Sequence, residues 1–452
     1  MTLIDGLIIF FAILLVYFFI VFILKKNGFL ERHHISLSGP FLLIRTTKFK
    51  NLLDKIAKRK RFWKSYGSFG VFLCLLIMIT FVILIIFNFS IIFQLTPEQK
   101  AVLPGPETAL VLPGINPILP VEYLFYILLA FLIAIVVHEF SHGILAIVSK
   151  IKVKSVGLLC FIFPIGAFCE PDEDQLKKAD TVKRMRVFAA GPLSNFVVAF
   201  VCILLFSYVF MGAVQQVDGA DILYVVPGSP AEEIGITSGA VVTNVNDTEI
   251  IGINDFSIAM ANISPNQEVN ITYYFAEEFV TKKAKLASLS EFSGNDSHKN
   301  TSFLGVSFNL YTNLLNYLKN PLTSDLFGSF IVLYSFPFIA YQYGYNPIAE
   351  PFINGYQITG PLSALPSSVF WGFVNALFWI FWLNLLVGIF NSLPILPLDG
   401  GHLFKDSLDI IVRKIKKDIS DEKREALVKN ISLIVSLLIL FLVIFPFFIG
   451  YF

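Results

Sequence analysis

Charged residues are scarce in this chain of 452 residues, where Asp, Glu, Lys and Arg together make up 15% against about 25% in soluble proteins. With 56% hydrophobic residues, this composition excludes an ordinary soluble domain and a disordered chain. The 34 basic and 33 acidic residues nearly cancel. The chain therefore lacks the net positive charge that would attract a polyanion, and no nucleic-acid partner is predicted.

Cysteine is also rare. The four cysteines, Cys74, Cys160, Cys169 and Cys202, show no Cys-x-x-Cys spacing. This argues against a disulfide framework and against a cysteine-based zinc site.

Long apolar runs are what the chain does contain. A helix that spans a bilayer needs about 20 apolar residues. Six runs meet this length: 6–24, 66–95, 123–148, 187–214, 369–398 and 431–452. The fold class predicted is therefore a polytopic α-helical membrane protein with about six transmembrane helices. A further uncharged stretch, 326–349, is broken by Pro337 and is predicted to lie on or dip into the outer membrane face, with a hairpin of two half-spans as the alternative.

The basic residues indicate how the chain is oriented. Of the 34, 12 lie in 25–64, 8 in 150–186 and 8 in 405–429. The positive-inside rule makes these three loops cytoplasmic, which agrees with six crossings from an outside N-terminus. The segment 215–368 then faces outward. Within it, alternating apolar residues and Gly and Asn/Asp turns from 221 to about 307 predict a small domain of short strands with a helix near 231–234.

Two acids, Glu139 and Asp399, lie inside or at the end of an apolar run, and an ionisable group at membrane depth is a functional-site hypothesis. Glu139 belongs to the sequence HEFSH. On a helix, His138 and His142 share one face and can bind one metal ion, while Glu139 reaches a ligand on that metal. Zinc lowers the pKa of its water from about 15.7 to about 7, and Glu139 would pass the proton to the leaving amine. A chance match is the alternative, which the cost of unpaired polar groups in hydrocarbon weakens.

A catalytic zinc ion takes three protein ligands, so a third is expected from elsewhere in the membrane. The run 369–398 ends in helix-breaking prolines that deliver Asp399 at the cytoplasmic end of its span, at a depth similar to that of His142. A carboxylate would also offset part of the zinc charge. Asp399 is therefore preferred over His402, and a simple turn residue in Asp-Gly-Gly is the non-functional alternative.

At these motifs the sequence resembles the site-2 proteases, zinc metalloproteases that cut within membranes. HEFSHG at 138–143 resembles the family's HExxHG, and LPLDGGH at 396–402 resembles its LDG motif. GPLSN at 191–195 and ITGPLSAL at 358–365 are similar to two further family elements. VVPGSPAEEIGITSGAVV resembles a PDZ domain. The resemblance covers about 121–452 and leaves the first 120 residues outside the shared core.

The resemblance implies roles for particular residues. His138, His142 and Asp399 would bind zinc, and Glu139 would be the general base. Asn195 would face the active site and hold the substrate strand or stabilise the oxyanion, with helix packing as the alternative.

Two further segments gain expectations from the resemblance. Gly191 and Pro192 would let backbones approach closely or loosen their helix. Residues 166–169 would form an edge that pairs with an unwound substrate by strand addition, with a plain connecting loop as the alternative.

The chain is therefore predicted to be an intramembrane zinc endopeptidase that cleaves transmembrane segments of membrane proteins in regulated intramembrane proteolysis. Its partners would be these substrates and the lipid bilayer. The predicted location is a prokaryotic plasma membrane, with the active site toward the cytoplasm and the PDZ-like domain outside. Because the turn at 227–230 departs from a Gly-Leu-Gly-Phe-type loop, steric gating is favoured over peptide capture.

The predicted divisions follow the motifs. They are 1–120 (two added helices and a basic loop), 121–214 (core helices), 215–312 (PDZ-like domain), 313–368 (outer membrane-associated segment), 369–402 (core helix ending in LDG) and 403–452 (basic loop and last helix). Three other classes are weaker. A CAAX-type protease would need a second glutamate in an apolar span, a transporter would show paired halves, and an idle scaffold would not need Glu139.

Overall fold

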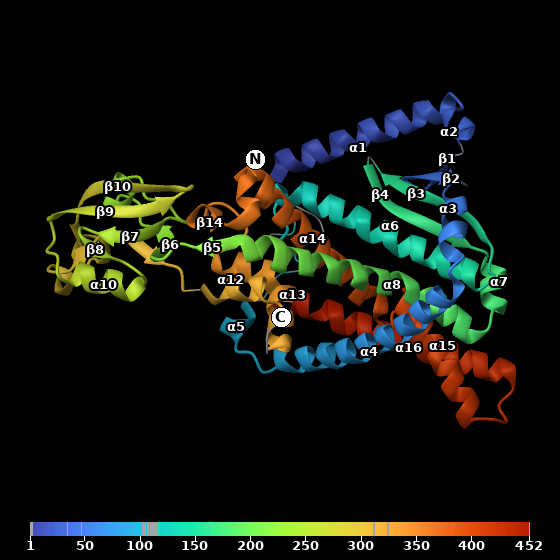
Figure 1. Cartoon of the computed structure of the whole chain (residues 1–452). Helices are drawn as coiled ribbons and strands as arrows, with labels where there is room; N and C mark the ends of the chain where they lie inside the picture. The colour runs from blue at the N-terminus through green and yellow to red at the C-terminus, as the bar shows by residue number, and fades with distance from the viewer. Residues whose placement is uncertain are drawn as a thin grey trace. The chain divides into compact units, whose positions relative to one another are not determined.

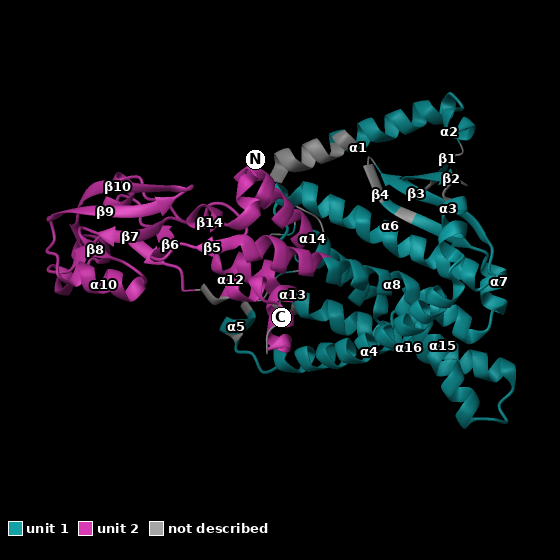
Figure 2. Cartoon of the chain, in the orientation of Figure 1, with its two compact units in different colours: residues 1–201, 379–452 teal, residues 202–378 magenta. Residues whose placement is uncertain are grey.

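The structure is a computed structural model, and it describes residues 3–451 except 34, 47, 102–104, 106–107, 109–115, 117, 162, 311 and 323–324. The chain forms two compact units (Figure 2): unit 1 is residues 1–201 with 379–452, and unit 2 is residues 202–378. These limits differ from the divisions predicted above, which stay predictions.

Helices make up most of unit 1 (Figure 1). In chain order they are α1 Leu3–Lys26, α2 Phe29–Arg32, α3 Lys48–Ala57, α4 Lys60–Ile92, α5 Pro97–Ala101, α6 Leu124–Val148, α7 Glu173–Lys178, α8 Thr181–Leu204, α14 Ser367–Ser392, α15 Asp399–Ile415 and α16 Asp421–Ile444. The limits of unit 2 fall near the end of α8 and inside α14.

Six helical segments of the described residues are long and apolar enough to cross a membrane. Five contain α4, α6, α8, α14 and α16 and coincide with predicted runs. The predicted run 6–24 forms α1. The sixth segment is α13 (Leu326–Tyr343), which continues through Pro337. The break expected at Pro337 is therefore not found in this helix, whereas the predicted position at the outer membrane face stays a prediction. An internal proline costs about 3 kcal/mol or more in a soluble helix, yet it is tolerated in membrane helices whose neighbours satisfy the freed backbone groups.

A four-stranded antiparallel sheet joins the N-terminal region to the rest of unit 1. Its order is β1 (Ile35–Ser38), β2 (Phe41–Thr46), β3 (Val153–Phe161) and β4 (Phe163–Pro171). In the register of β2 and β3, Leu43 lies opposite Leu159 and Arg45 lies opposite Gly157. A Cβ atom on Gly157 would collide with the Ile44 carbonyl oxygen and the Phe168 ring, so this close approach requires glycine. The first 120 residues, which the resemblance leaves outside the family's shared core, thus supply two of the four strands of this sheet.

The N-terminal helices also pack tightly on the core. On α3, Leu53 and Ala57 are buried in a cluster with residues of α6 and α8. On α4, a Cβ at Gly67 would lie 2.9 Å from the Leu145 side chain, and one at Gly70 would lie 3.0 Å from the Leu193 side chain. These glycines allow α4 to approach α6 and α8 closely.

Unit 2 contains a small α+β domain. Its strands are β5 Val214–Gln216, β6 Ala220–Val225, β7 Val241–Val245, β8 Thr248–Glu249, β9 Glu268–Phe275, β10 Glu278–Lys285, β11 Ala287–Ser288, β12 Ser302–Phe303, β13 Val306–Phe308 and β14 Tyr356–Ile358. The helices of unit 2 are α9 Pro230–Glu233, α10 Ile253–Ala261, α11 Leu289–Ser293, α12 Thr312–Lys319 and α13. The main sheet has the order β10-β9-β7-β6-β13, with β8 paired to β7. The strands from β6 to β13 and the helix α9 lie where the sequence predicted short strands and a helix, whereas β5 and β14 lie outside the predicted range.

One partly buried carboxyl group of this domain has a raised pKa. Asp221, on β6, lines a cavity of about 610 Å³. Burial raises the pKa of Asp221 to about 6, although the Gln216 side chain donates a hydrogen bond to it. The folded domain therefore holds a proton on Asp221 at pH values where the unfolded chain, with a pKa of about 3.9, has released it.

This pKa predicts how stability depends on pH. Between about pH 4 and pH 6 the folded state binds more protons than the unfolded state, so the free energy of unfolding falls as the pH rises. Asp221→Asn should remove this dependence and stabilise the domain at pH 7 by on the order of 2 kcal/mol. Pulse proteolysis of the full chain in urea at pH 5 and pH 7.5 measures it, with the exposed Asp218→Asn as the control. An unchanged pH dependence in Asp221→Asn would refute the assignment.

Candidate metal centre

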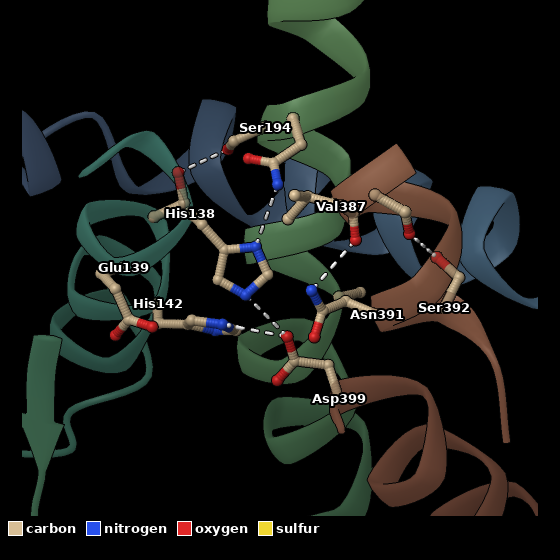
Figure 3. Close-up of polar contacts among 12 residues, drawn as sticks. His138, Glu139, His142, Ser194, Val387, Asn391, Ser392 and Asp399 are labelled. Carbon is tan, nitrogen blue, oxygen red and sulfur yellow. Dashed lines mark hydrogen bonds and ion pairs between the residues drawn. The ribbon is translucent and has the colours of Figure 1, made fainter. Parts of the chain in front are cut away.

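Three predicted ligand residues from two helices converge in unit 1 (Figure 3). His138 and His142 lie one turn apart on α6, and Asp399 is the first residue of α15. The Nε2 atoms of the two histidines lie 3.0 and 3.2 Å from Oδ2 of Asp399. Within the part of the chain that the structure describes, these three side chains form the group of potential ligands that could hold a metal ion.

The Gly-Gly pair after Asp399 explains how the carboxylate reaches this position. The chain turns between the end of α14 at Ser392 and the start of α15. A Cβ at Gly400 would collide with the Leu393 carbonyl oxygen, and one at Gly401 would lie 2.6 Å from the Ile395 carbonyl carbon. Only glycine lets the first turn of α15 press against the preceding loop, so the Asp-Gly-Gly sequence sets the place of Asp399.

Contacts between α8 and α15 hold the rest of α15 in place. Arg184 binds Asp406 through two hydrogen bonds, 2.9 Å from Nε and 2.6 Å from Nη2. One turn nearer the metal centre, the His402 ring stacks on Phe188 with centroids 4.6 Å apart and an interplanar angle of 11°. His402, the competing third ligand, is therefore engaged with an aromatic ring and lies outside the group formed with Asp399.

The hydrogen bond of His142 fixes which ring nitrogen is free to bind a metal. Its Nδ1 lies 2.7 Å from the carbonyl oxygen of Val187. A carbonyl only accepts, so Nδ1 must carry the proton and donate it. The lone pair of the neutral ring is then on Nε2, which faces Asp399. A second partner of this kind is usual for histidines that bind metals.

Asn195 contacts Nδ1 of His138, as the Val187 carbonyl contacts Nδ1 of His142. The Asn195 side chain is fully buried, and its Nδ2 lies 3.3 Å from His138 Nδ1. If His138 binds metal through Nε2, its Nδ1 carries a proton, and two donors would face each other. Rotating the amide by 180° brings Oδ1 to this place. Among the described atoms, that oxygen is buried without a hydrogen-bond partner, so the rotation gives it the His138 Nδ1–H as a donor.

This contact predicts that Asn195 acts on metal affinity. Asn195→Ala should weaken zinc binding about 10- to 100-fold, as loss of a group that orients a ligand does, whereas Asn195→Asp keeps an acceptor and should retain most of the affinity. Competition with a fluorescent zinc chelator measures it. Asn384→Ala is the matched control, because Asn384 is equally buried on α14 and, among the described residues, donates to the Ile380 carbonyl of its own helix. Wild-type affinity in Asn195→Ala would show that the residue serves another purpose.

Glu139 lies next to the ligands without joining them. Its Oε2 accepts a hydrogen bond of 3.0 Å from the backbone N–H of Cys169 on β4, and Figure 3 shows its carboxylate beside His142. β4 is an edge strand of its sheet. The structure thus brings the predicted base and the predicted substrate edge together through this bond.

Gly191 leaves open the space between the two histidines. A Cβ at this position would lie 2.5 Å from Nε2 of His142 and 2.6 Å from Nε2 of His138. Two imidazole nitrogens and a carboxylate are ligands that zinc accepts in catalytic sites, at about 2.0–2.2 Å. The three side chains and this open cradle fit a zinc ion.

Some groups around the site were not found from the sequence. The Val187 carbonyl is invisible to residue patterns, because every residue has one. Tyr66 on α4 hydrogen-bonds Ser194 at 2.7 Å, and Ser194 in turn bonds Ser141 on α6. This hydroxyl chain connects residues 128 positions apart, and serines inside apolar helices usually indicate packing.

Comparison with known proteins identifies the family. The sequence profile of peptidase family M50 matches residues 126–442, and the chain belongs to this family. The prediction of a site-2 protease, a zinc metalloprotease of the membrane, is confirmed at this level, and zinc is its metal.

Relatives differ in how much of the chain they share. An uncharacterized protein of Methanocaldococcus jannaschii is 25% identical over 84% of this chain and 81% of its own length. The zinc metalloprotease RasP of Shouchella clausii is 27% identical over 53% of this chain and 54% of its own length. A solved PDZ domain of an SdrC-like protein from Listeria monocytogenes covers 21% of this chain at 16% identity, with a TM-score of 0.18, which is too low to assign a fold.

Proposed function

We propose that this protein hydrolyses a peptide bond within a transmembrane helix of another membrane protein. One observation carries the proposal: His138, His142 and Asp399 meet on helices that adjoin or form segments long and apolar enough to span a membrane. A protease site formed between membrane-spanning helices would act on a substrate segment that is itself in the membrane.

In the proposed reaction, His138 and His142 hold the zinc ion through Nε2, and Asp399 holds it through its carboxylate. When bound, zinc polarises the scissile carbonyl and activates a water molecule. Glu139 accepts a proton from the attacking water and delivers it to the leaving amine. Asn195 keeps the proton of His138 on Nδ1. The substrate or oxyanion contact expected from the resemblance stays a prediction.

The substrate must be partly unwound, because a helical carbonyl is hydrogen-bonded and shielded. The position of β4 at the end of its sheet supports strand addition as the way an unwound segment is held. Since Cys169 N–H already contacts Glu139, a substrate strand on this edge would lie beside the general base.

The topology and the biological setting are part of the same proposal. The basic loops support a topology in which the metal centre lies toward the cytoplasm and the α+β domain, as a PDZ-like filter, lies on the outer side of a prokaryotic plasma membrane. Cleavage there would release a cytoplasmic product as a signalling step, after an earlier cut removes the outer part of the substrate.

Metal removal tests the proposal. Purified protein in detergent is incubated with a single-span substrate, and the cut is located by mass spectrometry. Treatment with 1,10-phenanthroline should abolish cleavage, and stoichiometric zinc should restore it at the same bond inside the apolar segment. Cleavage that survives metal removal would refute the zinc mechanism, and a cut confined to soluble flanks would refute the intramembrane site.

A further inference from the structure

An exposed cluster of cations lies where α3 ends and α4 begins. Within residues 55–64, six basic side chains are exposed: Lys55, Lys58, Arg59, Lys60, Arg61 and Lys64. Phe62, between them, is 58% exposed. We call these seven residues the 55–64 surface. Among the described residues, none of the six cations has an ion-pair partner within 4 Å.

This surface differs from the other basic loops of the chain. The loop 150–186 has eight bases and five acids, and the loop 405–429 has eight bases and six acids. Their charges pair in the structure, as in Lys154–Asp172, Arg184–Asp406 and Arg424–Asp409. The loop 25–64 has twelve bases and only two acids. The positive-inside rule accounts for bases in all three loops, but not for the unpaired excess in one.

The 55–64 surface is held on an ordered scaffold. α3 is anchored by Leu53, which is fully buried, and a Cβ on Gly143 of α6 would lie 3.0 Å from its side chain. The Trp63 Nε1–H donates to the Ile56 carbonyl at 2.9 Å and so ties the start of α4 to α3. The cations are therefore presented by packed helices and not by a loose tail.

Aromatic residues place this surface at the level of lipid headgroups. The rings of Phe62, Trp63 and Tyr66 are in mutual contact, with centroids 5.0 to 6.1 Å apart. Tryptophan and tyrosine are enriched at membrane–water interfaces. Lys60 is also the first residue of a segment able to span the membrane. Basic clusters directly beside a membrane helix attract anionic lipids.

From these contacts we infer that the 55–64 surface binds the phosphate headgroups of anionic phospholipids. The exposed Phe62 ring would enter the acyl boundary while the surrounding cations contact headgroups. Through Leu53 and Gly143, the bound lipid would hold α3 against α6 one residue from His142. This lipid site is independent of whether the protein cleaves transmembrane helices.

Photocrosslinking tests the lipid site on the full chain. The protein is reconstituted in phosphatidylcholine nanodiscs that contain photoactivatable phosphatidylglycerol, and crosslinked peptides are identified by mass spectrometry. Crosslinks should concentrate in residues 55–64 and fall at least threefold in 0.5 M NaCl. Photoactivatable phosphatidylcholine should give at least threefold fewer crosslinks there.

Matched variants show whether the charges are responsible. Lys58→Gln/Arg59→Gln/Arg61→Gln should lose at least two thirds of the crosslinks, whereas the control Lys282→Gln/Lys283→Gln/Lys285→Gln, which neutralises three exposed lysines of β10, should keep them. Zinc content and gel-filtration behaviour confirm that each variant is folded. Equal crosslinking by the first variant and wild type, or equal crosslinking by the two lipids, would overturn the inference.

Discussion

Replacing Glu139 by glutamine is expected to leave one zinc ion bound per chain while cleavage of a single-span substrate falls about 10³-fold, the range for loss of a general base. The substitution keeps the shape of the side chain and an oxygen that can accept from Cys169 N–H. What it removes is the ability to take up a proton. Zinc content by mass spectrometry and initial cleavage rates measure the two expectations separately.

A neighbouring acid supplies the control for this experiment. Glu170 follows Cys169 on β4 and accepts a hydrogen bond of 2.7 Å from Ser155. Glu170→Gln should retain zinc and at least half of the wild-type rate. Equal rates in Glu139→Gln and wild type would sink the assignment of Glu139 as the base. Loss of zinc together with activity would instead make Glu139 part of the metal centre.

Two kinds of signal in the sequence predicted the site: short-range spacing, and the rarity of acids inside apolar runs. His138 and His142 are four residues apart on a helix, so their shared face follows from helix geometry. Asp399 was predicted from a different signal, because acidic residues are rare inside or at the end of the apolar runs. Its meeting with the histidines across 261 positions depended on matching depths in the membrane, and the structure does bring the three together.

The parts that were not predicted depend on contacts between distant segments. From the sequence, residues 35–46 were predicted only as part of a basic loop. In the structure they form β1 and β2, and β2 pairs with β3 more than 100 residues later. A helix break was expected at Pro337, because an internal proline is costly in a soluble helix. α13 continues through Pro337, and membrane helices tolerate proline where neighbouring groups satisfy the freed backbone carbonyl. The motif placed Asn195 near the site, but its contact with His138 Nδ1 is found only in the structure. Its predicted role toward the substrate stays a prediction.

Gly191→Ala is expected to reduce zinc to below about 0.1 equivalent per chain and to abolish cleavage. The added methyl group would lie 2.5 Å from His142 Nε2 and 2.6 Å from His138 Nε2, in the space where a zinc ion must approach these nitrogens to about 2.0–2.1 Å. The Nδ1 atoms of both rings are engaged, that of His142 by the Val187 carbonyl and that of His138 by the Asn195 side chain. Neither ring can therefore rotate without losing its hydrogen bond.

Helix propensity alone predicts that Gly191→Ala stabilises α8 and does no harm, since alanine is favoured over glycine inside a helix by about 1 kcal/mol. Gly212→Ala provides the comparison, because its Cβ would lie 3.6 Å from the nearest atom, the Ser207 carbonyl oxygen. That variant should bind zinc and cleave as wild type does. A Gly191→Ala protein with full zinc occupancy would mean that the metal does not sit between the two Nε2 atoms. If zinc is lost in Gly191→Ala and kept in Gly212→Ala, the glycine of GPLSN serves the metal centre by keeping its space empty.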